Sequence, residues 1–271
     1  MISLMQKVRV GQDGKPSVPQ DDSCSANKEN RTIGKKLFLV GVGPGSSEYL
    51  TDIAKNVIRK SKYLIGYKYT LSIVTDLVIP NFHQVYEVTM RDQDQTYNEV
   101  YKKMGKNETC TIPFTGDVNF SESEVVDRLL EIFGKENVEL MPGISSIQVA
   151  ASKAKIPLDK TRVISFHVTE DIEDKKRELV EAIQDNKSVI LVPRPWNNNA
   201  EKNFMQSEIA TYLKNEGIDT STLKVWVFEF LTTEEERVFR GRLNELEKMI
   251  FNPLSVMVID QVSRKTYLEI E

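Results

Sequence analysis

The chain has 271 residues and a formal net charge of -4 at pH 7, and 40% of its residues are hydrophobic. This composition is typical of a globular protein of one or two domains, since a domain commonly holds about 150 residues. The weakly acidic balance argues against general nucleic-acid binding, which needs a basic surface. Cys24 and Cys110, with His83 and His167, form no metal-ligand cluster or disulfide framework, so no metal is expected.

Residues 1–34 are polar and show no hydrophobic period, and we expect them to form a flexible leader outside the fold. They lack the apolar core of a signal peptide. No apolar run in the chain reaches the ~18 residues that cross a membrane. A cytoplasmic protein without a membrane partner is therefore expected.

From Lys36 onward, short apolar runs alternate with helical patterns. Helices are predicted at 51–61, with Thr51 as N-cap and Ile53, Val57 and Ile58 on the buried face, and at 145–154. A third helix is predicted from Ser121, which would form a capping box with Glu124, to Gly134 as the stop. The strands predicted between these helices span 36–40, 62–66, 83–88, 109–114 and 137–141.

The pattern repeats in the second half of the sequence. Strands are predicted at 162–168, 188–192, 223–230 and 254–259. Helices are predicted at 175–185, 203–217 and 244–250. Helices alternating with continuous apolar strands indicate the α/β class, with sheets covered on both faces. The turn-rich segment 154–161 predicts a division into two α/β domains, 35–157 and 158–271.

Three predicted strands are each followed by a turn that contains glycine. These turns are VGVGPGSS (40–47), PFTGDVNF (113–120) and MPGISS (141–146). Because ligands of open α/β sheets bind at the carboxyl ends of the strands, the three turns could converge on one molecule. Backbone N–H groups, one carboxylate and two hydroxyls suit a zwitterionic or nucleoside ligand, whereas no GK[ST] phosphate motif accompanies them.

The first glycine turn was weighed against two other interpretations. A dinucleotide site would need GxGxxG and an acidic residue at the end of the second strand. Here the spacing is GxGxG, Pro44 removes one N–H donor, and the second strand ends in IGYKY (65–69). A tight structural turn remains the alternative for a single loop, but it does not account for three such loops.

These turns resemble the motifs of the tetrapyrrole (precorrin and uroporphyrinogen) methyltransferases. VGVGPGSSEYLT (40–51) is similar to their first motif, TGDVNF (115–120) to their GDP motif and PGISS (142–146) to a third. NPLSVMVI (252–259) is similar to a late strand of the family. The sequence departs from the pattern at Ser46, where the family has Asp, and at Val118, where it has Pro. The resemblance implies two α/β domains with mixed sheets and a cofactor cleft between them.

The resemblance also implies the cofactor S-adenosylmethionine, which has no phosphate and so tolerates Pro44. Asp117 is a candidate catalytic residue that could hold a cationic group or remove a proton, or it could only cap its turn. The cofactor-binding residues implied by the family motifs are Gly43, Pro44, Gly45, Gly116, Asp117, Phe120, Ser145, Ser146, Pro193, Leu231 and Pro253.

An anionic tetrapyrrole would need cations to bind its carboxylates. Lys68, Arg91 and Arg194 follow predicted strand ends and are candidate clamps, with plain surface charges as the alternative. His167 is a candidate substrate contact or a packing histidine.

Within the family, LIGYKYTL (64–71) and PGISSIQVAASKAKIPLDK (142–160) are most similar to the branch that methylates C-5 of cobalt-precorrins in cobalamin (vitamin B12) biosynthesis. Methyl transfer from a sulfonium is an in-line displacement that depends mainly on positioning. The resemblance also implies a homodimer, with a separate decarboxylating C(15)-methyltransferase as a further partner. The alternatives are a methyltransferase of the same fold that acts on diphthine or ribosomal RNA, and a non-catalytic S-adenosylmethionine-binding subunit.

Overall fold

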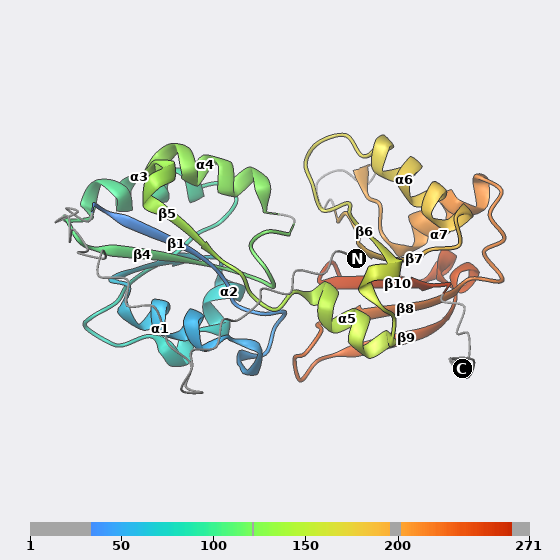
Figure 1. Ribbon diagram of the computed structural model, residues 1–271, viewed down its shortest axis with the longest axis horizontal. Coiled ribbons are helices and arrows are strands. Elements are labelled where there is room, and N and C mark those ends of the chain that lie inside the picture. Colours follow the sequence, from blue (N-terminus) through green and yellow to red (C-terminus); the bar gives the residue numbers. More distant parts are fainter. Residues whose placement is uncertain (1–33, 121, 196–201, 262–271) are drawn as a thin grey trace, which may run out of the picture. The chain divides into compact units, whose positions relative to one another are not determined.

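The computed structural model describes residues 34–120, 122–195 and 202–261, within one compact unit that spans Ile33–Glu271. The leader expected at residues 1–34 lies outside the described residues except for Gly34. The described residues form two five-stranded sheets with helices packed on their faces (Figure 1). Within those ranges, no helix combines the length and the apolar character needed to cross a membrane.

The first sheet is parallel throughout, with the strand order β3-β2-β4-β1-β5. All five strands predicted for this half are confirmed. Since parallel strands share one direction, the turns after them emerge at one edge of the sheet. The strands are β1 (Lys36–Gly41), β2 (Tyr63–Gly66), β3 (Gln84–Glu87), β4 (Thr109–Phe114) and β5 (Val138–Met141).

Two pairs of helices cover this sheet (Figure 1). Helices α3 (Gln93–Lys103) and α4 (Ser123–Phe133) bury one set of strand side chains. Helices α1 (Asp52–Lys60) and α2 (Lys68–Ile73) bury the opposite set. Cover on both faces explains why the strands read as continuous apolar runs.

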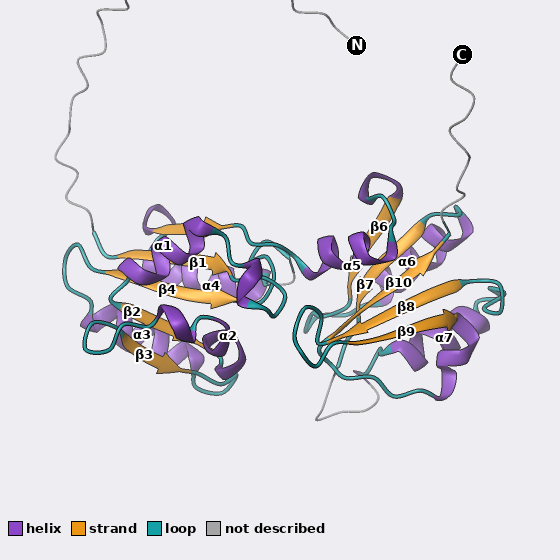
Figure 2. Cartoon of the chain, turned by 90° about the horizontal axis from the view of Figure 1, so that it is seen from below, coloured by secondary structure: helices purple, strands orange, loops and turns teal. Residues whose placement is uncertain are grey.

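The second sheet has the order β6-β7-β10-β8-β9, seen side by side in Figure 2. Only β6 and β7 pair in parallel, and the other pairs are antiparallel, so the expected mixed sheet is found in this half. The sequence did not predict β9, an edge strand in which three of the six residues are arginine. The strands are β6 (Thr161–Ser165), β7 (Ser188–Val192), β8 (Lys224–Glu229), β9 (Arg237–Arg242) and β10 (Ser255–Asp260).

The helices of this half also pack on both faces of their sheet. Helices α6 (Glu173–Gln184) and α7 (Gln206–Asn215) share a core with one face. Helix α5 (Ser146–Ala154) buries its apolar residues against the other face. The division expected at residue 157 stays a prediction, but α5, which precedes it in sequence, belongs by packing to the second sheet.

Several local predictions were wrong. Ile53 of α1 is 57% exposed, whereas Ala54 and Ile58 are buried and face the sheet. Helix α4 has Glu122 at its N-cap without a side-chain capping bond, and Ser121 lies outside the described residues. The expected capping box includes Ser121 and so lies partly outside the described residues, while Glu124 accepts hydrogen bonds from Thr169.

Turns and short helices account for the remaining differences. The helix predicted at 244–250 is a 3-10 helix over Leu243–Lys248. Helices α2 and α3 were not predicted from the sequence. The other 3-10 helices are Ser47–Tyr49, Thr75–Leu77, Lys135–Asn137 and Leu158–Lys160.

Candidate functional site

The three glycine turns meet at a junction of backbone atoms. Gly43 and Gly116 exchange two hydrogen bonds, with the Gly43 nitrogen 3.3 Å from the Gly116 oxygen and the Gly116 nitrogen 2.7 Å from the Gly43 oxygen. A Cβ placed on Gly143 would lie 2.4 Å from the Gly116 oxygen and 2.6 Å from the Gly41 carbonyl. Glycine is required here because the obstacles are backbone atoms that cannot rotate away.

A turn after β8 closes against the first glycine turn. The Ser46 nitrogen donates to Thr232 Oγ1 at 3.0 Å, and a Cβ on Gly45 would lie 2.6 Å from Thr233 Cγ2. Phe230 and Thr232 adopt positive φ angles of 49° and 72°, a region that L-residues rarely occupy. Such strain is concentrated at functional sites. Leu231, held between these two residues, faces the cavity described next.

A cavity opens beside the glycine junction, and its lining residues come from both halves of the fold. The turns of the first sheet and the α5 N-terminus contribute most of the polar groups, and the strands and turns of the second sheet contribute mainly apolar ones. The lining residues are Pro44, Thr115, Gly116, Asp117, Phe120, Glu122, Ser145, Ser146, His167, Val192, Phe228, Leu231, Pro253, Leu254, Ser255 and Val256.

Most of the residues that the sequence singled out lie around this one cavity. Gly43 and Gly45 shape the backbone beside it, while the buried Pro193 follows the lining residue Val192 without lining the cavity itself. Their roles in cofactor binding stay predictions. The predicted residues that line the cavity are Pro44, Gly116, Asp117, Phe120, Ser145, Ser146, His167, Leu231 and Pro253.

Asp117 fixes the turns of the junction. Its Oδ1 accepts from the Asn119 nitrogen at 2.7 Å, and its Oδ2 accepts from the Gly143 nitrogen at 2.8 Å. The carboxylate therefore ties the turn after β4 to the turn after β5. With both oxygens engaged by backbone donors, the capping role predicted as the alternative is the one that this geometry favours.

Ser145 also has a structural hydrogen bond. Its hydroxyl accepts from the Ile147 nitrogen at 3.2 Å, and its own nitrogen donates to Gln148 Oε1 at 2.8 Å, which caps α5. Ser146 is the first residue of the helix and lines the cavity. The N-terminal end of α5 thus directs partial positive charge toward the cavity wall.

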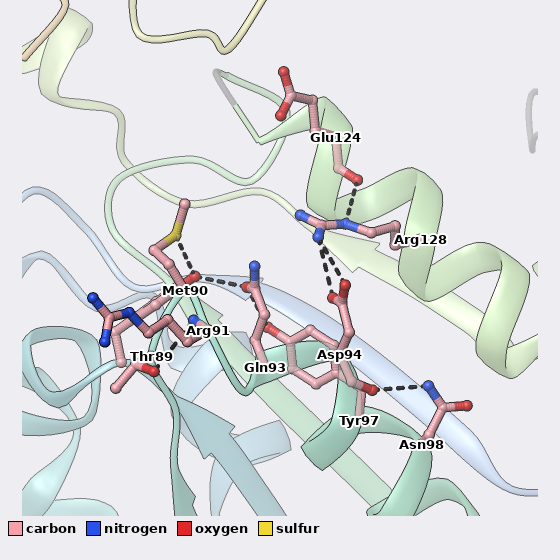
Figure 3. Close-up of polar contacts among 10 residues, drawn as sticks. Thr89, Met90, Arg91, Gln93, Asp94, Tyr97, Asn98, Glu124 and Arg128 are labelled. Atoms are coloured by element: carbon pink, nitrogen blue, oxygen red, sulfur yellow. Dashed lines mark hydrogen bonds and ion pairs between the residues drawn. The ribbon is translucent and has the colours of Figure 1, made fainter. Parts of the chain in front are cut away.

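Arg194 is not placed as a substrate clamp. It is only 5% exposed, and its guanidinium donates to the carbonyl oxygens of Thr169 and Glu170 at 3.2 and 3.1 Å. The side chain thus supports the loop after β6. Lys68 and Arg91 are exposed and lie beyond the cavity lining, and Figure 3 shows Arg91 in the turn before α3. Their role as clamps stays a prediction.

Glu122 lines the cavity and was not predicted from the sequence. It is half-buried, and desolvation raises the pKa of its carboxyl to about 7. His167 lines the same cavity, and desolvation lowers its pKa although part of the ring is exposed. The sequence signal for Glu122 is an acidic residue shortly after a glycine turn at a strand end, between the predicted capping residues Ser121 and Glu124.

A second, wider hollow lies between α7 and the 3-10 helix Leu243–Lys248. It is lined by exposed polar and charged groups such as Lys214, Asp219 and Glu247, and none of the glycine turns reaches it. Across the described residues there is no group of three or more His, Cys, Asp or Glu placed to hold a metal ion. The cavity beside the glycine junction is therefore the candidate active site.

A parallel sheet and a mixed sheet that both contribute to one cavity define an α/β fold with its candidate site at strand ends. Residues 36–247 match the family model of the tetrapyrrole (corrin/porphyrin) methylases. The chain belongs to this family.

Relatives and solved structures agree with this assignment. The chain is similar to a probable cobalt-precorrin-7 C(5)-methyltransferase of Methanocaldococcus jannaschii, with 32% identity over 227 residues. The match covers 83% of this chain and 97% of that relative. A precorrin-6Y methylase from Archaeoglobus fulgidus has a similar fold, with a TM-score of 0.57, 18% identity and coverage of 83% of this chain and 97% of that one. A uroporphyrin-III C-methyltransferase from Thermus thermophilus, complexed with S-adenosylhomocysteine, is also similar in fold. Its TM-score is 0.61 at 18% identity, and the match covers 83% of this chain and 91% of that one.

Proposed function

We propose that the protein is an S-adenosylmethionine-dependent C-methyltransferase that methylates C-5 of an anionic cobalt-precorrin in cobalamin biosynthesis. The observation that carries the proposal is the 32% identity to the Methanocaldococcus jannaschii protein, which extends over 97% of that relative. A likeness over nearly the whole relative includes the turns that line the cavity as well as the strands of both sheets.

The cavity supports this chemistry. A sulfonium cofactor has an apolar adenine and a zwitterionic methionyl group, and the cavity combines an apolar wall with hydroxyls and a helix N-terminus. No covalent nucleophile is required, since methyl transfer depends on alignment of the methyl carbon between sulfur and the acceptor carbon. The tetrapyrrole would enter on the side of Lys68 and Arg91, whose charges could pair with its carboxylates.

The two departures from the family motifs do not argue for a non-catalytic binder. Ser46 accepts a hydrogen bond from the Glu48 nitrogen and caps the 3-10 helix, a role for which Ser and Asp are about equally suited. Val118 is 1% exposed and packs in the core of the first sheet, so an apolar side chain still fills that position.

A homodimer in the cytoplasm belongs to the same proposal, with a decarboxylating C(15)-methyltransferase as a separate partner. These parts are supported by resemblance to the family. Sedimentation of the purified protein would test the dimer, and a monomer at micromolar concentration would contradict it.

The cofactor is tested by thermal unfolding with S-adenosylmethionine, S-adenosylhomocysteine or NADH. A ligand at 100 times its Kd stabilises by about 2.7 kcal/mol, which raises Tm by roughly 5–10 °C for a chain of this size. Shifts with the first two ligands and none with NADH are expected. A shift with NADH alone would refute the proposal.

Two substitutions on α5 locate the binding site. Ser146→Phe places a ring in the cavity and should abolish the shift, because Ser146 lines it. Ser152→Phe is the matched control on the exposed side of the same helix and should keep the shift. Equal shifts in both variants would place the cofactor elsewhere.

A further inference from the structure

Glu122 is placed in the cavity by the way α4 begins. It is the residue before the first turn of the helix, yet its side chain makes no capping bond to the helix backbone. No hydrogen bond or ion pair to its carboxylate is formed by any residue within the described ranges. With respect to the described residues, the carboxylate therefore has no bonded partner, and it lines the cavity together with Gly116 and Ser146.

The first turns of α4 are tied to neighbouring elements by polar contacts, some of which Figure 3 shows. Arg128 Nη1 lies 3.1 Å from both carboxylate oxygens of Asp94 on α3, and Arg128 Nε donates to the Glu124 carbonyl at 3.2 Å. From the other sheet, the Thr169 nitrogen and Oγ1 donate to Glu124 Oε1 at 3.2 and 2.5 Å. These bonds anchor the start of the helix that carries Glu122, and such support positions a reacting group.

Acidic, basic and neutral groups lie on the elements around Glu122. Burial raises the pKa of Tyr67 and of Tyr97, and the charge of Glu122 adds to both increases. The Tyr67 hydroxyl donates to Gln93 Oε1 at 2.6 Å and so is already engaged. The titratable and charged groups on the elements around Glu122 are Tyr67 after β2, Asp94 and Tyr97 on α3, Asp117 after β4, Glu124 and Arg128 on α4, and His167 after β6.

We infer that Glu122 is the catalytic base, which takes up the proton that the substrate carbon loses when it is methylated. This inference rests on the proposed function and adds to it the group that handles the proton. The residue is a side chain of the cavity wall itself, so it can reach a substrate that lies against the cofactor turns.

The reaction requires such a group, because a methyl cation replaces a proton. The bond between sulfur and methyl carbon breaks, its electron pair stays on sulfur, and S-adenosylhomocysteine forms. A π electron pair of the tetrapyrrole forms the new carbon–carbon bond, which leaves one excess positive charge on the ring. The Glu122 carboxylate removes the proton from the methylated carbon, the electrons of that C–H bond restore the ring system, and the protonated carboxyl then releases the proton to water.

The other titratable groups of the cavity are less suited to this role. Both oxygens of Asp117 already accept backbone N–H groups, so protonation would cost a hydrogen bond of the glycine junction. Desolvation lowers the pKa of His167, which makes the imidazole a weaker base. The same effect raises the pKa of Glu122 to about 7, which makes it a stronger base that is about half ionised at neutral pH.

The experiment compares methyl transfer to a reduced cobalt-precorrin by wild type, Glu122→Gln, Glu122→Asp and Glu131→Gln. Glu131 is exposed on the same helix and is the matched control. Loss of a positioned base lowers kcat by about 10²–10⁴-fold. We expect this loss in Glu122→Gln, with little change in substrate KM or in S-adenosylhomocysteine affinity, and partial rescue in Glu122→Asp. Wild-type kcat/KM should rise with pH to a plateau above pH about 7, and Glu122→Gln should lack this rise.

The outcomes separate this inference from the function on which it rests. If wild type transfers methyl and Glu122→Gln does so within threefold of its rate, the assignment of Glu122 is wrong and the proposed function stands. A pH rise near 7 that persists in Glu122→Gln would also overturn the assignment. If wild type transfers no methyl to any cobalt-precorrin, the proposed function fails and the inference fails with it.

Discussion

Gly143→Ala should disrupt the glycine junction more than an ordinary Gly→Ala change would. The added Cβ would lie 2.4 Å from the Gly116 oxygen and 2.6 Å from atoms of Gly41, and all of these are backbone atoms. Forcing atoms into packed positions typically costs 1–3 kcal/mol. Because no rotamer change relieves this contact, we expect the free energy of unfolding to fall by about 3 kcal/mol, which lowers Tm by roughly 6–12 °C for a chain of this size.

The assay is thermal unfolding of the variant beside two control substitutions. Gly34→Ala places its Cβ at an ordinary 3.4 Å from Asn137 Oδ1, and it should leave Tm nearly unchanged. In Gly217→Ala the added Cβ has no neighbour within 4 Å, but the residue must keep a φ of +82°. This variant therefore isolates the backbone strain, which costs about 1–2 kcal/mol. A Tm shift of about 2 °C corresponds to less than about 1 kcal/mol for a chain of this size. If the Tm of Gly143→Ala lies within about 2 °C of the Tm of Gly34→Ala, the description of the junction as rigid is wrong.

Three further substitutions test the site and its support. Glu122→Gln should be more stable than wild type at pH 8 by about 2–3 kcal/mol in urea unfolding, because the rise of the pKa from 4.5 to about 7 makes the folded state bind its proton more tightly. The stabilisation by the bound proton of Glu122 is complete below pH 4.5 and is lost as the pH rises through about 7. Equal stabilities of the variant and wild type at pH 8 would refute this prediction. Asp117→Asn should lower the free energy of unfolding by about 2 kcal/mol, because one of the two backbone N–H groups would then face an amide N–H. An unchanged urea midpoint would contradict this. Arg194→Met should lower the free energy of unfolding by about 2–3 kcal/mol, because two backbone carbonyl oxygens lose their donor. A raised substrate KM with an unchanged Tm would contradict this and would support a role of Arg194 in substrate binding.

The sequence predicted the strands well because most of them are buried on both faces and read as short apolar runs. It missed β9, whose three arginines suit an exposed edge strand and interrupt the apolar run. It also missed α3, where polar residues dominate and only Gln93, Tyr97 and Val100 are buried. Such elements are defined by tertiary packing more than by local pattern.

The candidate site was predictable where backbone geometry demands glycine. The turns at Gly43, Gly116 and Gly143 do converge, as the rule for strand ends predicts. The roles of charged side chains were not predictable, because burial and pairing depend on distant segments. Arg194 bonds to the loop after β6, Glu124 bonds to Thr169 of the same loop, and Glu122 lines the cavity.

The most direct test of the proposed function is transfer of an isotopically labelled methyl group. Purified protein is incubated with S-adenosylmethionine labelled in its methyl carbon and with a reduced cobalt-precorrin that lacks the C-5 methyl. The product is then examined by mass spectrometry and NMR. One labelled methyl group at C-5, with an equal amount of S-adenosylhomocysteine, is the predicted result. Binding of the cofactor without transfer, or label found on protein or RNA instead, would contradict the proposal.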